Sequence, residues 1–268
     1  MDIIVKYIDE LLEKSTPDAP MWNIEKIRDG GVKSNWNYID GVMIKAVLQM
    51  YDVTKDEKYL KFADDFIDYR VHEDGTIEGY SVGEKNIDNV NAGKTLFELY
   101  DLTGKEKYRK AIDLVYSQIE IMPRCNNEAR SFWHKDIYPN QVWLDGLYMC
   151  QPFYMEYETR FNYKKNYDDI FLQFKNVIKN MKDPVKNMRD PKTGLYYHAY
   201  DSSREMFWCD KVTGLSQNFW LRALGWYSMA LLDTIDKADE CDDTELLKTT
   251  FRELMDAMLK YQDESGMW

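Results

Sequence analysis

The chain has 268 residues, a formal net charge of −12 and 44% hydrophobic residues. This length allows one large domain or two small ones with a sizeable core, and the hydrophobic fraction excludes a disordered chain. The acidic balance, without any basic stripe, argues against a nucleic-acid partner, because phosphate binding needs clustered Lys and Arg. No apolar run approaches the roughly twenty residues that cross a bilayer, so we expect no membrane partner either.

The cysteines and the first residues of the chain predict a cytoplasmic protein without a metal. Cys125, Cys150, Cys209 and Cys241 form no CxxC pair and have no metal-ligand spacing, so we interpret them as reduced thiols. The N-terminus begins an amphipathic helix and lacks the charged and apolar regions of a signal peptide.

Helical periodicity dominates the chain, and the sequence shows no convincing strand ladder. The segment that starts Tyr51-Asp52-Val53-Thr54 recurs at Tyr100-Asp101-Leu102-Thr103, and a weaker copy begins at Tyr157. Each copy predicts a tight connection between two antiparallel helices. The predicted helices cover residues 2–14, 36–51, 57–71, 218–236 and 243–262, and others begin near Asp88 and Val142.

The connections between these helices alternate in length. They are short near 52–56, 101–104 and 160–163, and long near 73–86, 122–139 and 183–216. The long loops hold most of the Gly, Pro, His and Trp residues, which would gather function-bearing side chains on one rim. An open solenoid would have short connections on both sides, so we favour a closed double ring of helices, an all-α toroid, as a single domain over residues 1–268.

Two carboxylates stand at matching places in this repeat. Asp145 lies as far before Tyr157 as Asp88 lies before Tyr100, and each is expected at the start of an inner helix. Paired acids suit general acid/base work on a sugar. An Asp in a first turn is more often a helix cap, and for Asp40 we favour that alternative.

One acid of such a pair must hold a proton near neutral pH. Burial against aromatic side chains raises the pKa of a carboxyl, whereas a helix N-terminus lowers it. Because Trp143 directly precedes Leu144-Asp145, we expect desolvation to keep Asp145 protonated.

Two histidines and one arginine complete the candidate site. His134 and His198 both fall in the long loops, beside aromatic residues. Arg222 lies among apolar residues in a helix, where a buried cation needs an anion. That anion is either an Asp or Glu of the protein or the carboxylate of a substrate.

These motifs resemble one family when they are taken together and in order. They are Trp36-Asn37-Tyr38 with Gly41, Asp88, His134-Lys135, Val142-Trp143-Leu144-Asp145-Gly146, Tyr197-His198 and Trp220-Leu221-Arg222-Ala223-Leu224-Gly225-Trp226. The combination resembles glycoside hydrolase family 105, the unsaturated rhamnogalacturonyl hydrolases, and more distantly the unsaturated glucuronyl hydrolases of family 88. The likeness covers nearly the whole chain.

The resemblance implies an (α/α)6 barrel that removes the terminal 4,5-unsaturated galacturonic acid from rhamnogalacturonan and other pectin-lyase products. An acid protonates C4 of the vinyl ether, water adds at C5, and the hemiketal opens and releases the sugar. Asp145 would be the acid/base, with Asp88 positioning the substrate or tuning the pKa. The implied substrate-binding residues are Tyr38, His134, Lys135, Trp143, His198, Trp220, Arg222 and Trp226, and no cofactor is implied.

The chain departs from the family pattern in its number of helices. A six-hairpin barrel has twelve, and we predict about nine, so the ring is expected to be open and C-terminally truncated. Two other functions remain open at this stage. One is an unsaturated glucuronyl hydrolase acting on glycosaminoglycan fragments, and the other is a helical-array binding protein or inactive truncated homologue. The sequence predicts no particular oligomeric state.

Overall fold

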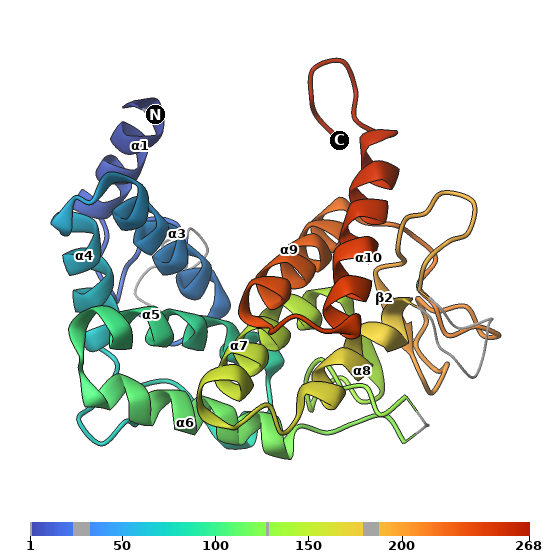
Figure 1. Ribbon diagram of the computed structural model, residues 1–268, viewed down its shortest axis with the longest axis horizontal. Helices are drawn as coiled ribbons and strands as arrows, with labels where there is room; N and C mark the ends of the chain where they lie inside the picture. The colour runs from blue at the N-terminus through green and yellow to red at the C-terminus, as the bar shows by residue number, and fades with distance from the viewer. Residues whose placement is uncertain (1, 24–32, 127–128, 179–187) are drawn as a thin grey trace. The chain divides into compact units, whose positions relative to one another are not determined.

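The computed structural model describes residues 2–23, 33–126, 129–178 and 188–268. The chain forms two compact units (Figure 1). The first comprises Met1–Gly83 with Asp88–Glu120, and the second comprises Glu84–Ile87 with Ile121–Trp268. Nine α-helices lie in the described residues, as the sequence predicts, and none of those helices is long and apolar enough to cross a membrane.

The described residues of the first unit form α-helices and two 3-10 helices that precede α5. Tight connections follow α3 and α5. The bounds of the helices are α1 Asp2–Glu13, α3 Tyr38–Thr54, α4 Glu57–Asp68, η1 Val82–Glu84, η2 Ile87–Gly93, α5 Lys94–Thr103 and α6 Glu106–Ile121. Within this unit α3 packs against α4 and α5, and apolar side chains such as Ile44, Leu48 and Phe97 are fully buried.

The predicted internal repeat corresponds to two equivalent helix ends. Lys55 after α3 and Gly104 after α5 both adopt the left-handed conformation, with φ of 56° and 68°. Their backbone N–H groups donate to the carbonyl oxygens of Tyr51 and Tyr100, the tyrosines that begin the two copies. This is the usual way in which a left-handed residue terminates an α-helix. The short connections at 52–56 and 101–104 are therefore confirmed.

The start of α3 corrects one interpretation of the sequence. Asn37, rather than Asp40, is the N-cap, because its side chain accepts the backbone N–H of Asp40. Asp40 is a buried acceptor, and its carboxylate receives hydrogen bonds from Trp22 Nε1 (2.8 Å), Ser34 Oγ (2.9 Å) and Asn37 Nδ2 (2.9 Å). Burial raises the pKa of Asp40, although these three hydrogen bonds work against that rise.

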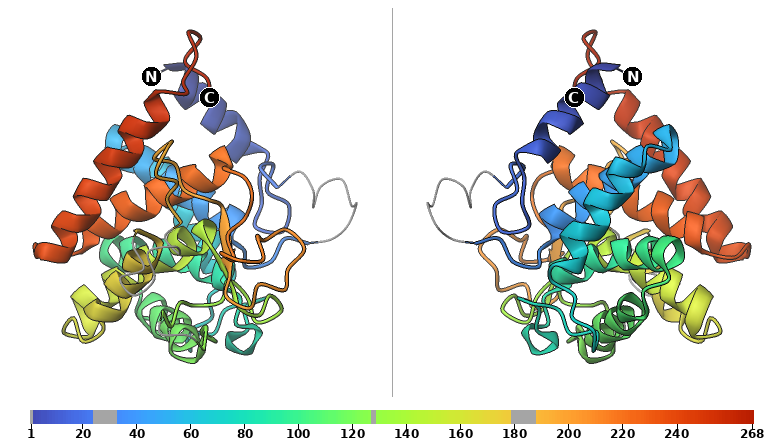
Figure 2. Two further views of the ribbon diagram at one scale, coloured as in Figure 1. Left: turned by 90° about the vertical axis from the view of Figure 1, so that its right-hand side faces the viewer. Right: turned by 90° about the vertical axis from the view of Figure 1, so that its left-hand side faces the viewer.

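Where the structure describes the second unit, it forms four α-helices and one pair of short strands. Their bounds are β1 Gln141–Trp143, α7 Leu144–Phe161, α8 Tyr167–Ile178, β2 Ala199–Asp201, α9 Leu221–Lys237 and α10 Asp242–Leu259. α7 packs against α8 and α9, and α10 packs against α8 and α9. α9 (orange) and α10 (red) run side by side in both views of Figure 2.

Two features of the backbone differ from the prediction. β1 and β2 pair in antiparallel register, with Val142 opposite Tyr200, where we expected no strands. Three-residue strands are too short to show an alternating pattern, so periodicity does not detect them. α5 also begins at Lys94 rather than near Asp88, because residues 87–93 form the 3-10 helix η2.

Candidate active site

The strand pair fixes the start of α7. Trp143 ends β1 in an extended conformation, with φ −116° and ψ 146°, and is the N-cap residue of the helix. The backbone N–H of Leu144 donates to the carbonyl oxygen of His198 at 3.1 Å, next to the β1–β2 pairing of Trp143 with Ala199. The backbone thus brings His198, from the long loop, to the first turn of α7. Asp145 is the second residue of that helix.

Asp145 contacts two basic side chains. Arg222 Nη1 donates to Oδ1 of Asp145, and His198 Nε2 lies 3.4 Å from Oδ2. Only 4% of the surface of Asp145 is exposed. The guanidinium of Arg222 also lies over the indole of Trp220, at 3.8 Å from the ring centroid, in a cation–π contact. Of the two anions considered for Arg222, the structure thus places a protein carboxylate beside it.

The charge state of Asp145 is the reverse of the sequence-based prediction. Burial, the largest influence, raises the pKa of the Asp145 carboxyl, as we expected. The neighbouring His198 imidazole, with Nε2 3.4 Å from Oδ2, and the charge of Arg222 outweigh burial, so the pKa lies below its ordinary value of 3.8. The prediction was wrong because the sequence does not show that Arg222 and His198 reach the carboxylate. Asp145 is therefore ionised at neutral pH in this structure.

A layer of aromatic rings lies beside Asp145. The rings of His134 and Tyr138 are both nearly parallel to the indole of Trp143, with centroids 4.5 Å and 5.4 Å away. Gly146 leaves room for this arrangement, because a Cβ at that position would lie 2.9 Å from His134 Nδ1. His134 is buried, and its ring packs against the indole of Trp143.

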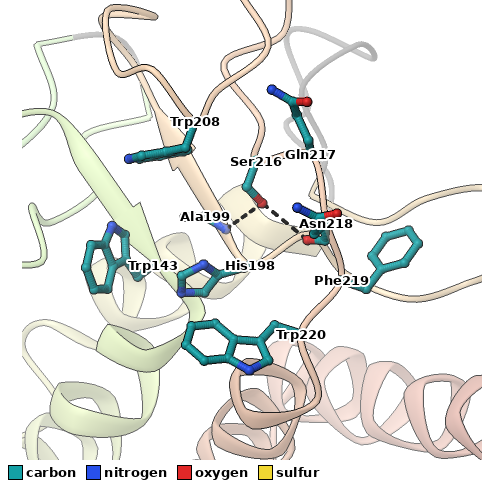
Figure 3. A pocket seen from close by; sticks show the side chains of 9 residues that line it. All are labelled: Trp143, His198, Ala199, Trp208, Ser216, Gln217, Asn218, Phe219 and Trp220. Atoms are coloured by element: carbon teal, nitrogen blue, oxygen red, sulfur yellow. Dashed lines mark hydrogen bonds between the residues drawn. The ribbon is translucent and has the colours of Figure 1, made fainter.

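A cavity of about 550 Å³ opens next to His198. This volume falls within the roughly 300–1,000 Å³ of small-molecule sites, and the mixture of aromatic walls with a few polar groups is also typical of them. Figure 3 shows His198 between the indoles of Trp143, Trp208 and Trp220. Ser216 Oγ accepts the backbone N–H of Ala199 and donates to the carbonyl oxygen of Asn218, which ties the two walls of the cavity together.

The structure gathers several predicted residues in the second unit. Trp143, His198 and Trp220 line the cavity, and Asp145 and Arg222 contact them. Other predicted residues of this unit have different surroundings. Trp226 stacks on Tyr148 at 4.9 Å, and the ammonium of Lys135 lies 5.8 Å from the ring centroid of Tyr138.

Tyr38 and Asp88 belong to the first unit. Tyr38 is the first residue of α3, and its carbonyl oxygen accepts a hydrogen bond from Asn91 Nδ2 at 3.1 Å. Asp88 is half-buried within η2. The pairing of Asp88 with Asp145 stays a prediction.

Sequence reasoning did not single out Trp208, Ser216, Asn218 or Phe219, all of which line the cavity. A signal for Trp208 existed, since it is a tryptophan within the long 183–216 loop, where we expected functional side chains. No signal in the sequence marked Ser216 or Asn218, because their place in the cavity wall depends on hydrogen bonds to the backbone. In the part of the chain that the structure describes, no group of three or more His, Cys, Asp or Glu side chains is placed to hold a metal ion.

Comparison with known proteins identifies the family. Residues 15–268 match the family model of Glycosyl Hydrolase Family 88. The chain is 43% identical to a glycoside hydrolase from family 105 of C. acetobutylicum ATCC 824, with a TM-score of 0.82 over 91% of this chain and 67% of that chain. The chain therefore belongs to Glycosyl Hydrolase Family 88 and is of the family 105 type.

Two further relatives define the extent of the likeness. The chain is 25% identical, over 241 residues, to the unsaturated rhamnogalacturonyl hydrolase YesR of Bacillus subtilis (strain 168), covering 87% of this chain and 63% of YesR. An unsaturated glucuronyl hydrolase specific for heparin shares the fold, with a TM-score of 0.64 at 13% identity over 97% of this chain and 66% of that chain. The chain thus has the (α/α)6 toroid fold class, as predicted, and spans less than two thirds of the length of YesR.

Proposed function

We propose that this chain is a glycosidase that removes a terminal 4,5-unsaturated galacturonic acid from rhamnogalacturonan and pectin-lyase oligosaccharides by hydrating the vinyl ether. The observation that carries the proposal is the buried Asp145 carboxylate, held between Arg222 and His198 beside an aromatic cavity. The sequence likeness to YesR supports the choice of substrate.

The ion pair of Arg222 with Asp145 suggests how an ionised residue becomes an acid. A guanidinium binds carboxylates well, and the unsaturated uronate brings a carboxylate of its own. When that carboxylate engages Arg222, Asp145 loses part of its cationic environment while burial against aromatic rings remains. Loss of the neighbouring positive charge leaves burial as the main influence and raises the pKa of Asp145, so that substrate binding itself favours the protonated form.

The reaction then needs a single group that gives and regains a proton. Asp145 donates its proton to C4 of the vinyl ether, and the double-bond electrons form the new C4–H bond, which leaves positive charge at C5 and the ring oxygen. Water adds at C5 and returns a proton to the Asp145 carboxylate. The resulting hemiketal opens and releases the sugar to which the uronate was joined. The sum is the addition of one water, and Asp145 ends in its starting state.

The other side chains have supporting roles in this proposal. His198 stays beside Asp145 and contacts the uronate or its hydroxyls, while Trp143 and Trp220 enclose the ring. Asp88 remains the predicted partner that positions the substrate.

The test is turnover of two unsaturated disaccharides by the chain as it stands. One is an unsaturated galacturonyl–rhamnose disaccharide, and the other is an unsaturated glucuronyl disaccharide from a glycosaminoglycan. Loss of the ultraviolet absorbance of the conjugated double bond reports the reaction. We expect the higher kcat/KM on the first substrate. Faster turnover of the second would move the assignment to a glucuronyl hydrolase, and turnover of neither would contradict the proposal.

A further inference from the structure

One wall of the cavity has no part in the proposed proton transfer. Trp208 lies in the segment between β2 and α9 and contributes its indole to the cavity lining. In Figure 3 it lies at the opposite end of the cavity from Trp220, with His198 between them. The cavity therefore extends beyond the side chains that surround Asp145.

The end of the cavity near Trp220 is the reacting end. The guanidinium of Arg222 lies over the indole of Trp220, 3.8 Å from the ring centroid, and Arg222 also pairs with Asp145. A uronate whose carboxylate engages Arg222 and whose C4 meets Asp145 must lie there. Its neighbouring sugar then extends toward the end of the cavity that Trp208 forms.

The loop that carries Trp208 is held by many hydrogen bonds. The fully buried Asp201 carboxylate accepts the backbone N–H groups of Ser203, Glu205 and Met206, at 2.8–2.9 Å. Lys211 Nζ donates to the carbonyl oxygens of Glu205 and Met206, at 3.0 Å and 2.7 Å. These contacts fix the backbone on both sides of Trp208 without a ligand. A preformed wall binds a ligand without the cost of ordering a loop.

We propose that Trp208 is the stacking platform for the sugar on the leaving-group side, the ring to which the unsaturated uronate is joined. The inference rests on the proposed function, which it extends from the reacting ring to the next one. The face of an indole offers a large rigid apolar surface, which matches the C–H face of a pyranose. Trp208 therefore sets how strongly the chain prefers a sugar over a small leaving group.

The experiment compares two substrates that share the unsaturated galacturonate. One carries rhamnose as its leaving group and the other carries methanol as a methyl glycoside. We expect Trp208→Ala to lower kcat/KM about 10-fold on the disaccharide, the loss typical of one stacked aromatic ring, and less than about 3-fold on the methyl glycoside. Trp208→Phe is expected to retain most of the disaccharide activity.

Phe207→Ala is the matched control. Phe207 is the neighbouring aromatic residue, is 87% exposed and is not among the residues that line the cavity. We expect this variant to match the wild type on both substrates. Equal losses on both substrates in Trp208→Ala, or a loss no larger than that of Phe207→Ala, would overturn the inference while leaving the proposed function intact.

A binding measurement separates the two proposals if the wild type turns over neither substrate. That result contradicts the proposed function, and calorimetry with the same disaccharide then tests the platform alone. Weaker binding by Trp208→Ala than by Phe207→Ala would support a sugar subsite at Trp208. Absence of binding by the wild type would overturn both proposals.

Discussion

Asp40 and Asp145 begin two helices of this chain in almost the same local sequence. One lies in Tyr38-Ile39-Asp40-Gly41 and the other in Trp143-Leu144-Asp145-Gly146, and each is 4% exposed. Their partners differ. Asp40 receives its side-chain hydrogen bonds from an indole, a hydroxyl and an amide, all of them neutral, whereas Asp145 meets Arg222 and His198.

This difference sets opposite pKa shifts in two carboxyls of equal burial. At Asp40 the hydrogen-bond donors are neutral and the charge of Arg70 is a smaller opposing influence, so burial prevails and the pKa of Asp40 is raised. At Asp145 the Arg222 guanidinium and the His198 imidazole outweigh the effect of burial, so the pKa of Asp145 is lowered. An Asp in the first turn of a helix therefore becomes a reactive group through partners from distant segments, here His198 and Arg222. Asp40 accepts hydrogen bonds from within its own unit, and Asp145 faces a guanidinium that a substrate carboxylate can engage.

The largest expected effect separates the two acids by activity. Asp145→Asn removes the proton donor and should lower kcat/KM on the unsaturated galacturonyl–rhamnose disaccharide by roughly 10³-fold, within the range for general acid–base catalysis. Asp40→Asn, measured in the same assay, should stay within about 3-fold of the wild type. Circular dichroism of both variants checks that they fold. Comparable losses in the two variants would break the distinction between them.

Removing the cation beside Asp145 should have the next largest effect. Arg222→Gln deprives the substrate carboxylate of a charged hydrogen-bond partner, which is worth about 1.5–3 kcal/mol, so kcat/KM should fall roughly 10- to 100-fold. It should also raise the pKa of Asp145 in the free protein, seen as a shift of the kcat/KM pH profile to higher pH.

Lys175→Gln is the control for this change. Lys175 pairs with Asp243 at 2.7 Å elsewhere in the same unit, so its loss removes a comparable ion pair. We expect its activity and pH profile to be those of the wild type. An Arg222→Gln variant with an unshifted profile would show that Arg222 does not control the ionisation of Asp145.

The glycine after each acid should distinguish a structural site from a reactive one. A Cβ at Gly41 would lie 2.5 Å from the backbone Cα of Ala92, whereas one at Gly146 would meet the side chain of His134 at 2.9 Å. Gly41→Ala should therefore cost about 1–3 kcal/mol of unfolding free energy, as overpacking against backbone does. Gly146→Ala should cost less stability but disturb the ring of His134 against Trp143 and lower kcat. Thermal unfolding measures the stability of both variants, and steady-state kinetics measures their kcat. A larger loss of stability in Gly146→Ala, or a larger loss of kcat in Gly41→Ala, would contradict the structural role of Asp40 and the reactive role of Asp145.

The smallest effect is a difference of sign in the pH dependence of stability. Because its folded pKa is lowered, Asp145 contributes stability that is present above 3.8 and is lost as pH falls through the lower folded value. Asp40 has a raised folded pKa, so its contribution is present below 3.8 and is lost as pH rises through the higher folded value. As pH rises toward 3.8, the wild type should gain stability relative to Asp145→Asn, and as pH rises above 3.8, it should lose stability relative to Asp40→Asn. Urea unfolding at each pH measures both differences, and equal slopes would contradict the pKa assignments.

The sequence predicted most of the helical framework and only part of the site. Periodicity located the helices, and the Tyr51 and Tyr100 repeat located two connections, because these features depend on residues close together in the chain. Arg222 was predicted to be a buried cation that needs an anion; the structure supplies Asp145 as the anion, but the Arg222 side chain is 41% exposed, so the premise of burial was wrong.

The remainder depended on contacts between distant segments. The ionised state of Asp145 depends on His198 and Arg222, and their approach follows from the β1–β2 pairing and the packing of α9 on α7. Three-residue strands leave no periodic signal, so neither that approach nor the place of Trp208 in the cavity wall could be derived from local pattern.

The most direct test of the account follows the proton that Asp145 is proposed to deliver. The chain is incubated with the unsaturated galacturonyl–rhamnose disaccharide in D₂O, where the carboxyl proton exchanges for deuterium, and the released uronate is analysed by NMR. We predict one deuterium at C4 of the product from the wild type, and no product formation on the same timescale by Asp145→Asn. Release of rhamnose without deuterium at C4, or deuteration at the wild-type rate by Asp145→Asn, would contradict the proposed role of Asp145.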